Sequence, residues 1–334
     1  MTLKLALLGA GRIGNVHADA IASNPNATLV AVTDAMADAA AALAAKHHGC
    51  EVHSMEAIES DANIDAVIIC TPTDMHADLI ERFARAGKAI FCEKPIDLSA
   101  ARVRECLAVV EETDARLMVG FNRRFDPSFA AVRQAIDNGS VGDVELVQIT
   151  SRDPEAPPAS YATRAGGMLR DMTIHDFDIA RFLLGAEPVA VSAHASAITG
   201  QGVEEIGDID TATIILETAG GQQAVITNSR RATYGYDQRI EVHGSKGMAH
   251  AENMRPHNAE IATGDGYSRA PLEDFFMTRY VEAYRREIAG FVNMLKNDAP
   301  ASPSGEDGLR ALLLADAAYI SIEEKRRVMV SELA

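Results

Sequence analysis

A glycine pattern near the start of the chain constrains the fold more than any other feature of the 334-residue sequence. A continuous apolar run at residues 3–8 predicts a buried strand, and the pattern follows it at once. Its residues are Gly9, Ala10, Gly11, Arg12, Ile13 and Gly14. Gly9 permits a tight turn, Gly11 lets the backbone approach a pyrophosphate, and Gly14 allows the next helix to pack closely on the strand. That helix extends to about residue 21 and points its N-terminus at the phosphates. The pattern therefore predicts a dinucleotide-binding βαβ unit.

The end of the second predicted strand indicates which dinucleotide binds. This strand covers residues 28–33 and is followed by Asp34, 20 residues after Gly14. An acidic group at that position binds the hydroxyls of the adenosine ribose. No Lys or Arg follows until Lys46, so a 2′-phosphate would meet Asp34 without a neutralising charge. We therefore expect NAD rather than NADP.

Strands and helices continue to alternate up to about residue 122, which predicts a doubly wound parallel sheet. We expect further strands at residues 51–53, 65–70, 89–92 and 116–120, and helices at residues 35–47, 76–86 and 99–113. Ligands of such sheets bind beyond the carboxyl ends of the strands. Besides the glycine turn, three segments fall on that edge, and they contain Thr71, Pro72, Thr73, His76, Glu93, Lys94, Asn122, Arg123 and Arg124. We expect His76 either to start a helix or to contact the cofactor.

The pattern changes after residue 122. Successive β-branched strands are expected at residues 144–151, 189–197, 211–217, 223–229, 239–243 and 247–251, the last two joined by a hairpin turn. Helices are expected at residues 127–138, 279–296 and 306–325. This order predicts an α+β second domain with a large, open, mostly antiparallel sheet. We therefore divide the chain into a Rossmann domain at residues 1–122 and a substrate-binding and oligomerisation domain at residues 123–334.

Composition narrows the possible partners. The formal net charge of −17 argues against nucleic acid or an anionic membrane, and a hydrophobic content of 47% supplies a sizeable core. The negative charge favours a soluble cytoplasmic protein, and the opening residues lack the length and cleavage site of a signal peptide. The four cysteines show no zinc-ligand spacing, so we expect no metal and interpret them as buried, reduced thiols.

A dinucleotide site implies hydride transfer, and without zinc the protein itself must handle the proton of an alcohol. Lys94 follows a buried strand at the ligand-binding edge, where its charge could stabilise a developing alkoxide. Residues 164–184 predict a loop that leads into a helix capped by Gly185, and on that helix Asp171 and His175 would share a face. A carboxylate beside an imidazole suits a general base. The simpler alternative is an acidic first turn that interacts with the helix dipole.

Other polar residues have two interpretations each. Arg123 and Arg124, at the expected domain junction, either bind a polyol or pair with Asp126. Tyr234 and Tyr236 either offer phenol donors to a ligand or pack within a strand.

Taken together, residues 9–14, the Glu-Lys-Pro at residues 93–95 and the segment 166–176 resemble the Gfo/Idh/MocA family of oxidoreductases. Within it, residues 121–127 and 234–239 are similar to those of the bacterial inositol 2-dehydrogenases. The similarity covers essentially the whole chain. It implies NAD as cofactor and, in many members, a homotetramer built through the second-domain sheets. It also implies a catalytic trio of Lys94, Asp171 and His175.

The resemblance further implies ligand contacts. The cofactor would be bound by Gly9, Gly11, Arg12, Ile13, Gly14, Asp34, Thr71, Pro72, Thr73, His76, Glu93, Lys94 and Arg123. The substrate would be bound by Lys94, Arg124, Asp153, Asp171, His175, Tyr234 and Tyr236. The implied activity is NAD-dependent oxidation of myo-inositol to its 2-keto product. Scyllo-inositol, another cyclic polyol or the first carbon of an aldose would suit the same residues. An NAD-binding sensor without turnover, and a glycosidase that oxidises its substrate only transiently with NAD, are further alternatives.

Overall fold

A six-stranded, fully parallel sheet forms the centre of the N-terminal part of the protein, in the order β3-β2-β1-β4-β5-β6. The computed structural model describes residues 2–333. The strands are β1 (Leu3–Leu8), β2 (Ala27–Thr33), β3 (Glu51–Val52), β4 (Ala66–Ile69), β5 (Ala89–Glu93) and β6 (Leu117–Gly120). The four residues of β4 and of β6 are all buried, as a sheet covered on both faces requires. The predicted doubly wound sheet is confirmed.

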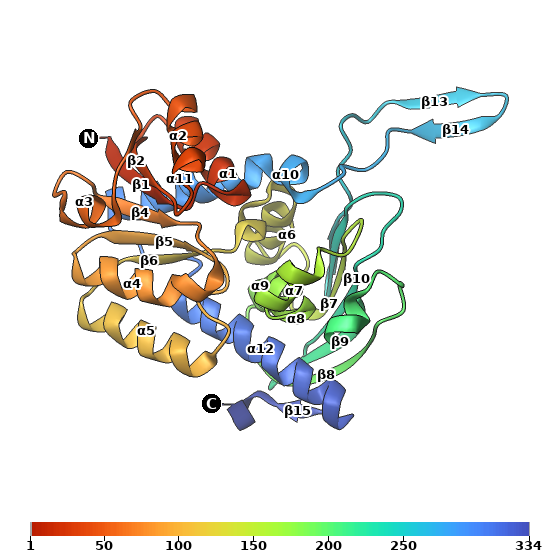
Figure 1. Ribbon diagram of the computed structural model, residues 1–334. Helices are drawn as coiled ribbons and strands as arrows, with labels where there is room; N and C mark the ends of the chain where they lie inside the picture. The colour runs from red at the N-terminus through yellow and green to blue at the C-terminus, as the bar shows by residue number, and fades with distance from the viewer. Residues whose placement is uncertain (1, 334) are drawn as a thin grey trace. The chain divides into compact units, whose positions relative to one another are not determined.

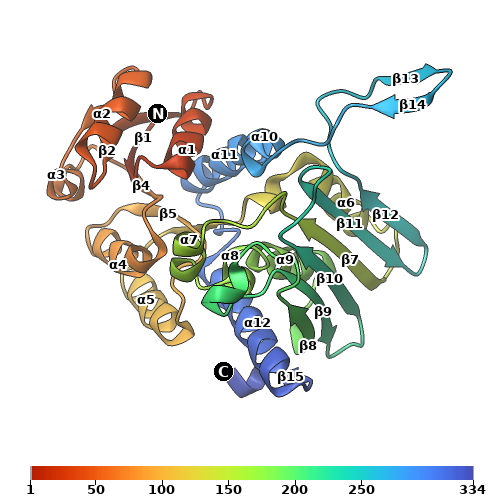
Figure 2. The same cartoon turned by 45° about the vertical axis from the view of Figure 1, so that its right-hand side comes forward.

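Helices connect these strands: α1 (Arg12–Ala22), α2 (Ala37–Lys46), α3 (Met55–Ser60), α4 (His76–Arg85) and α5 (Ala100–Glu112). The chain passes from β1 to β2 toward the β3 edge of the sheet, and from β4 to β5 toward the β6 edge. Because parallel crossovers are right-handed, these opposite directions place α1 and α4 on opposite faces of the sheet. Helix α4 packs beside α5, and α1 packs beside the late helix α11 (Val281–Asn297), as both views show (Figures 1 and 2).

A mixed seven-stranded sheet organises the second part, in the order β12-β11-β7-β10-β9-β8-β15. Only the β7–β10 pair is parallel among its pairings, so the prediction of a mostly antiparallel sheet is confirmed. The strands are β7 (Val144–Arg152), β8 (Pro188–Ser196), β9 (Thr211–Thr218), β10 (Gln223–Ser229), β11 (Asp237–Gly244), β12 (Gly247–Ala251) and β15 (Val328–Met329). Helices α6 (Pro127–Asp137) and α9 (Ile174–Leu184) pack on this sheet. Strand β9 buries Ala212, Ile214 and Leu216, whereas Ile215 between them is 38% exposed.

Smaller elements complete this part: the helices α7 (Ala159–Arg164), α8 (Met168–Asp171) and α10 (Phe276–Arg279), and most of α12 (Gly305–Glu324). Four 3₁₀ turns also occur along the chain: η1 (Thr73–Met75), η2 (Asn122–Phe125), η3 (Val203–Ile206) and η4 (Val330–Leu333). A separate hairpin of β13 (Glu260–Thr263) and β14 (Gly266–Arg269) extends as an arm from the end of β12 (Figure 1). All eight of its strand residues are exposed. The sequence pattern predicted neither this hairpin nor α3.

Contacts between residues divide the chain into two units, and each unit is built from two separate segments rather than one. The first unit contains residues up to Phe125 together with Val281–Leu312, and the second contains Asp126–Tyr280 with the residues from Leu313 onward. The first segment ends close to the expected boundary at residue 122. The sequence pattern did not predict the return of Val281–Leu312 to the first unit, which occurs because α11 packs on α1. The backbone of this segment also pairs with β6, where the Val119 amide donates to the Pro303 carbonyl at 3.0 Å.

The segment 164–184 differs from the predicted loop and single helix. Gly166 and Gly167 have φ values of +79° and +81°, which end α7 and begin α8. Asp171 closes α8 and His175 lies in α9, so the two residues belong to different helices. The turn between them is irregular, since the Thr173 amide donates to the Met168 carbonyl five residues back. The C-terminal cap is as predicted, with Gly185 at φ +64°.

Within the described residues, no helix is long and apolar enough to cross a membrane.

Candidate functional site

The first unit carries a glycine turn whose geometry fits a dinucleotide. A Cβ atom on Gly9 would lie 2.6 Å from the Cys70 carbonyl oxygen, and one on Gly14 would lie 2.0 Å from the Gly9 carbonyl oxygen. Both positions therefore need glycine for the fold itself. A Cβ on Gly11 would meet no atom of the described chain within 4 Å. Packing does not explain glycine at position 11, whereas a pyrophosphate lying against its backbone does.

Asp34 organises the same turn. One carboxylate oxygen accepts a hydrogen bond from the Ala10 amide at 2.6 Å, and the other accepts one from the Met36 amide at 2.7 Å. The carboxylate is thus held at the end of β2, beside the glycine turn. Each oxygen keeps further acceptor capacity for a ribose hydroxyl. This arrangement fits the predicted ribose contact.

His76 joins two other segments at the same sheet edge. It begins α4 and is buried, with Nδ1 2.8 Å from the Pro95 carbonyl oxygen and Nε2 2.8 Å from the Thr71 carbonyl oxygen. Burial lowers the pKa of His76, against the opposing effect of the two carbonyls. The expected helix start is confirmed, and the cofactor contact stays a prediction. The His76 ring connects the loops that follow β4 and β5. The hydroxyl of Thr71 is buried and has no hydrogen-bond partner among residues 2–333, as expected of a group that hydrogen-bonds a ligand.

Glu93 and Lys94 end β5. The buried Glu93 carboxylate lies 2.7 Å from Nε2 of His17, a fully buried residue of α1. The His17 ring packs edge-on against Phe91, with ring centres 5.0 Å apart. The pair thereby connects the helix that follows the glycine turn to the loop that carries Lys94. The Lys94–Pro95 peptide bond is cis.

His17 was missed by reasoning from sequence. Its place three residues after Gly14 gave no sign of a partner 76 residues later. Helical periodicity identifies a buried face, but it does not identify the strand end that this face meets.

Arg123 and Arg124 lie in η2 of the first unit. Arg123 is buried, and Arg124 donates to Asp307 at 2.9 Å. Asp126, the alternative partner considered for these arginines, caps α6 through the Ser128 and Phe129 amides and forms a buried ion pair with Arg279.

The second unit carries a polar cluster around Asp171. One oxygen of its carboxylate accepts from the Tyr161 hydroxyl at 3.1 Å, and the other accepts from Nη2 of Arg230 at 3.2 Å. Nη1 of the same guanidinium lies 3.4 Å from Asp153. Two predicted site residues, Asp171 and Asp153, are therefore bridged by one buried arginine. No sequence pattern distinguishes Arg230 from its neighbour Arg231.

Hydrogen bonds connect the first turn of α9, which carries His175, to strand β10 of the sheet. The Asn228 amide group of β10 donates to Asp176 at 2.8 Å and accepts from the Thr173 hydroxyl at 2.9 Å. Asp176 and Asp178 are both fully buried. The alternative interpretation of this segment is an acidic first turn formed by Asp171, Asp176 and Asp178. Of these three residues, only Asp176 lies in the first turn of α9.

The two predicted tyrosines differ in environment. Tyr234 is half exposed, and its hydroxyl donates to Asp237 at 2.6 Å and accepts from Arg152 at 2.7 Å. Tyr236 is buried and packs edge-on against Tyr280, with ring centres 6.0 Å apart.

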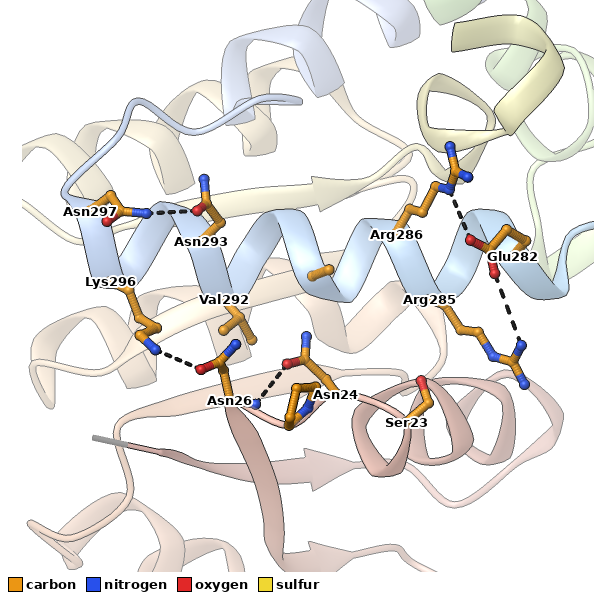
Figure 3. A pocket seen from close by; sticks show the side chains of 12 residues that line it. Ser23, Asn24, Asn26, Glu282, Arg285, Arg286, Val292, Asn293, Lys296 and Asn297 are labelled. Atoms are coloured by element: carbon orange, nitrogen blue, oxygen red, sulfur yellow. Dashed lines mark hydrogen bonds and ion pairs between the residues drawn. The ribbon is translucent and has the colours of Figure 1, made fainter. Parts of the chain in front are cut away.

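A groove of about 690 Å³ also opens in the first unit, between α11 and the loop after α1 (Figure 3). Its polar side chains interact mainly with one another, as Lys296 does with Asn26 at 2.7 Å. None of the predicted site residues lines this groove. In the described part of the chain, no group of three or more His, Cys, Asp or Glu residues could hold a metal ion.

All four cysteines are free and buried, as the sequence predicted. Burial raises the pKa of the Cys50 thiol to about 11 and that of the Cys106 thiol to about 12. The thiols are therefore protonated near neutral pH.

Residues 3–121 match the oxidoreductase family with an NAD-binding Rossmann fold, and residues 129–250 match the Gfo/Idh/MocA C-terminal domain. The chain belongs to the Gfo/Idh/MocA family. This membership confirms the NAD cofactor and the oxidoreductase class that the glycine turn and Asp34 predicted.

The chain is 64% identical over 331 residues to an inositol 2-dehydrogenase of Rhizobium meliloti (strain 1021), covering 99% of this chain and 100% of the relative. A crystal structure of a myo-inositol dehydrogenase from Corynebacterium glutamicum is 41% identical, with a TM-score of 0.95 over 98% of this chain and 99% of that one. A scyllo-inositol dehydrogenase from Lactobacillus casei, solved with bound NAD(H) and scyllo-inositol, is 30% identical, with a TM-score of 0.90 over 99% and 100% of the two chains.

Proposed function

We propose that the protein is an NAD-dependent dehydrogenase that oxidises one secondary hydroxyl of myo-inositol and yields the 2-keto inosose. The observation that carries this proposal is the 64% identity, over the whole length of both chains, to a protein named inositol 2-dehydrogenase. The glycine turn and Asp34 supply a fitting cofactor cradle, and the second unit supplies a cluster of acidic and basic side chains suited to a polyol.

When bound in this cradle, NAD would supply the hydride acceptor for the carbon that bears the hydroxyl. His175 takes the hydroxyl proton as general base, and Asp171 orients and stabilises the resulting imidazolium. Lys94 hydrogen-bonds the same oxygen and stabilises its negative charge. The secondary alcohol becomes a ketone by losing one hydride and one proton. The hydride would reduce the cofactor, and the proton would be held by His175.

Further contacts are proposed on the same basis. Arg124, Asp153, Tyr234 and Tyr236 bind the polyol, and the cofactor is bound by Arg12, Ile13, Thr71, Pro72, Thr73, His76, Glu93, Lys94 and Arg123 as well as by the glycines and Asp34. The functional division of the chain belongs to the same proposal. Residues 1–122, joined by the returning segment Val281–Leu312, bind the cofactor, and the remainder of residues 123–334 binds the substrate and mediates oligomerisation.

NADH absorbance with a panel of sugars tests the substrate. We expect strong turnover of myo-inositol and much weaker turnover of scyllo-inositol, D-chiro-inositol, glucose and galactose. Scyllo-inositol is the second candidate, because a dehydrogenase of that substrate shares the fold at a TM-score of 0.90. Preferred turnover of scyllo-inositol or a sugar would replace the substrate and keep the chemistry. NAD binding without turnover of the panel would favour a sensor, or a glycosidase that regenerates its cofactor.

Two substitutions test the catalytic roles. We expect His175→Ala and Lys94→Met each to lower kcat at least about 100-fold, the usual size of a lost general base or charge stabiliser. For His175→Ala, NAD affinity measured by calorimetry should remain within about threefold, because His175 is not among the proposed cofactor contacts and the glycine turn is untouched. Lys94→Met also removes a proposed cofactor contact, so its kcat is measured at saturating NAD. His194→Ala and Lys246→Met change exposed residues of β8 and of the β11–β12 turn and should retain full activity. Normal turnover in either test variant removes that residue from the mechanism.

We also propose that the protein is a cytoplasmic homotetramer assembled through the second-unit sheet. Four reduced thiols are consistent with a reducing compartment. The exposed Ile215 of β9 and Met248 of β12 give that sheet apolar surface for a partner copy. Light scattering should give about four times the chain mass of 35.7 kDa, and Ile215→Lys should lower it. A monodisperse monomer at micromolar concentration contradicts this part of the proposal.

A further inference from the structure

Arg230 occupies an unusual position among the charged residues of the second unit. Its side chain is 2% exposed and faces three carboxylates, those of Asp171, Asp153 and Asp208. The guanidinium reaches Asp171 through Nη2 at 3.2 Å and Asp153 through Nη1 at 3.4 Å. One buried positive charge therefore attracts three carboxylates in a region with little solvent.

The backbone fixes the base of this side chain. The Arg230 amide donates to the Asp210 carbonyl at 2.8 Å, and the Gln201 side chain donates to the Arg230 carbonyl at 2.9 Å. Asp210 is itself held by the Ile198 and Thr199 amides, at 3.0 and 2.9 Å. These hydrogen bonds hold the Arg230 backbone in place, and a residue that positions another side chain requires such support.

Electrostatics explain what such a group does for its neighbours. Burial disfavours the charged form of Arg230, yet its pKa is raised because Asp171 and Asp153 outweigh that effect. The same attraction acts on the carboxylates: without the guanidinium, the neighbouring acidic groups would repel one another with no positive charge between them. Asp171 needs its negative charge to stabilise an imidazolium.

Geometry adds to the charge effect. The guanidinium holds one oxygen of Asp171, and the Tyr161 hydroxyl holds the other. A carboxylate gripped at both oxygens cannot rotate freely, although it retains lone pairs for another donor.

We infer that Arg230 is a positioning residue for the dehydrogenase reaction, which keeps Asp171 anionic and correctly oriented while tying it to Asp153. This inference rests on the proposed function, in which Asp171 supports His175 as the base. Arg230 itself donates no proton and contacts no reacting atom; it acts through Asp171.

A double-mutant cycle tests the inference on the full-length enzyme. We expect Arg230→Met to lower kcat at least 30-fold, and Asp171→Asn to lower it at least 100-fold. Because Arg230 acts through Asp171, adding Arg230→Met to Asp171→Asn should cost less than a further threefold. Arg230→Lys keeps the charge without the fork and should recover part of the lost rate. Millimolar guanidinium chloride should restore activity to Arg230→Ala relative to an equal concentration of sodium chloride.

Controls separate a positioning role from a structural one. Arg231→Met removes the adjacent, exposed arginine, whose guanidinium donates to the Thr199 carbonyl, and should retain full kcat. NAD affinity and thermal midpoint are measured for every variant. The inference is overturned if Arg230→Met lowers kcat by the same factor in the Asp171→Asn background as in the wild type, and if neither lysine nor guanidinium restores the rate. Arg230 would then serve only the stability of the fold.

The outcomes also distinguish this inference from the proposed function. A wild-type enzyme that oxidises no polyol overturns the proposed function. Full turnover by Asp171→Asn removes the catalytic role of Asp171 and the inference with it. A slow Asp171→Asn variant beside a fully active Arg230→Met variant overturns the inference alone.

Discussion

Gly11 and Gly14 lie in one short turn but are glycine for different reasons. Position 14 is closed by the protein, since a Cβ would lie 2.0 Å from a backbone oxygen. Position 11 is open within the described chain, so packing does not account for its lack of a side chain, whereas a bound pyrophosphate does. A single added methyl group can therefore separate the demands of folding from those of cofactor binding.

We expect Gly11→Ala to change the free energy of unfolding by no more than about 1 kcal/mol, the scale of a helix-cap substitution. The same variant should bind NAD at least tenfold more weakly, because the methyl group occupies the space of the pyrophosphate. Gly14→Ala should destabilise the protein by about 1–3 kcal/mol, the usual cost of overpacking. Urea unfolding and calorimetry of NAD binding measure the two effects. Equal loss of stability in both variants contradicts the distinction.

At the scale of elements, His76 makes the edge between β4 and β5 sensitive to pH. The first nitrogen of its ring faces the Pro95 carbonyl and the second faces the Thr71 carbonyl. Burial keeps the pKa of the folded state below the ordinary value of 6.5. Below pH 6.5 the unfolded chain binds a proton that folded His76 does not, so protonation favours unfolding.

We therefore expect the free energy of unfolding to fall as the pH drops below about 6.5. The contribution of His76 has a slope of up to about 1.4 kcal/mol per pH unit, and it vanishes above that pH. Urea unfolding between pH 7.5 and pH 5.5 measures this slope. His76→Gln should lose the His76 part of it, whereas His243→Gln, at an exposed position of β11, should keep it. Identical slopes in wild type and His76→Gln contradict the assignment.

Periodicity and turn chemistry sufficed to predict both sheets, because buried parallel strands and glycine turns are local signals. They did not predict the break between Asp171 and His175, where the chain continues in a right-handed conformation with one irregular hydrogen bond. They also could not select His17 or Arg230, whose roles depend on partners at Glu93 and Asp171 that lie far away in the sequence. Motifs therefore indicate which groups do chemistry, and the folded structure indicates which groups hold them.

At the scale of the whole molecule, the cofactor-binding unit is discontinuous in sequence. Helix α11 returns to it after every strand of the second sheet except β15, and it packs on α1. Tyr284 of α11 lies edge-on to His17 at 5.4 Å, and Phe291 lies edge-on to Phe91 at 5.8 Å, measured between ring centres. The backbone near Pro303 also covers the outer edge of β6.

We expect a fragment of residues 1–122 to be far less stable than a fragment that joins residues 1–125 to residues 281–312 through a flexible linker. The shorter fragment exposes the apolar face that α11 covers and leaves β6 as an open edge. Circular dichroism melting and NAD binding measure the difference. The joined fragment should melt cooperatively and bind NAD, and an equally stable short fragment would contradict this account.

The late return of α11 also affects how genes of this kind recombine. A single crossover near codon 125 would combine the glycine-turn helix of one parent with the α11 helix of the other, so two surfaces that meet in the core would come from different lineages. A hybrid gene encodes a cofactor-binding unit from a single parent only when a second crossover restores the α11 of that parent. Among diverging copies of the gene, successful hybrids should therefore carry paired breakpoints, one near codon 125 and one near codon 280.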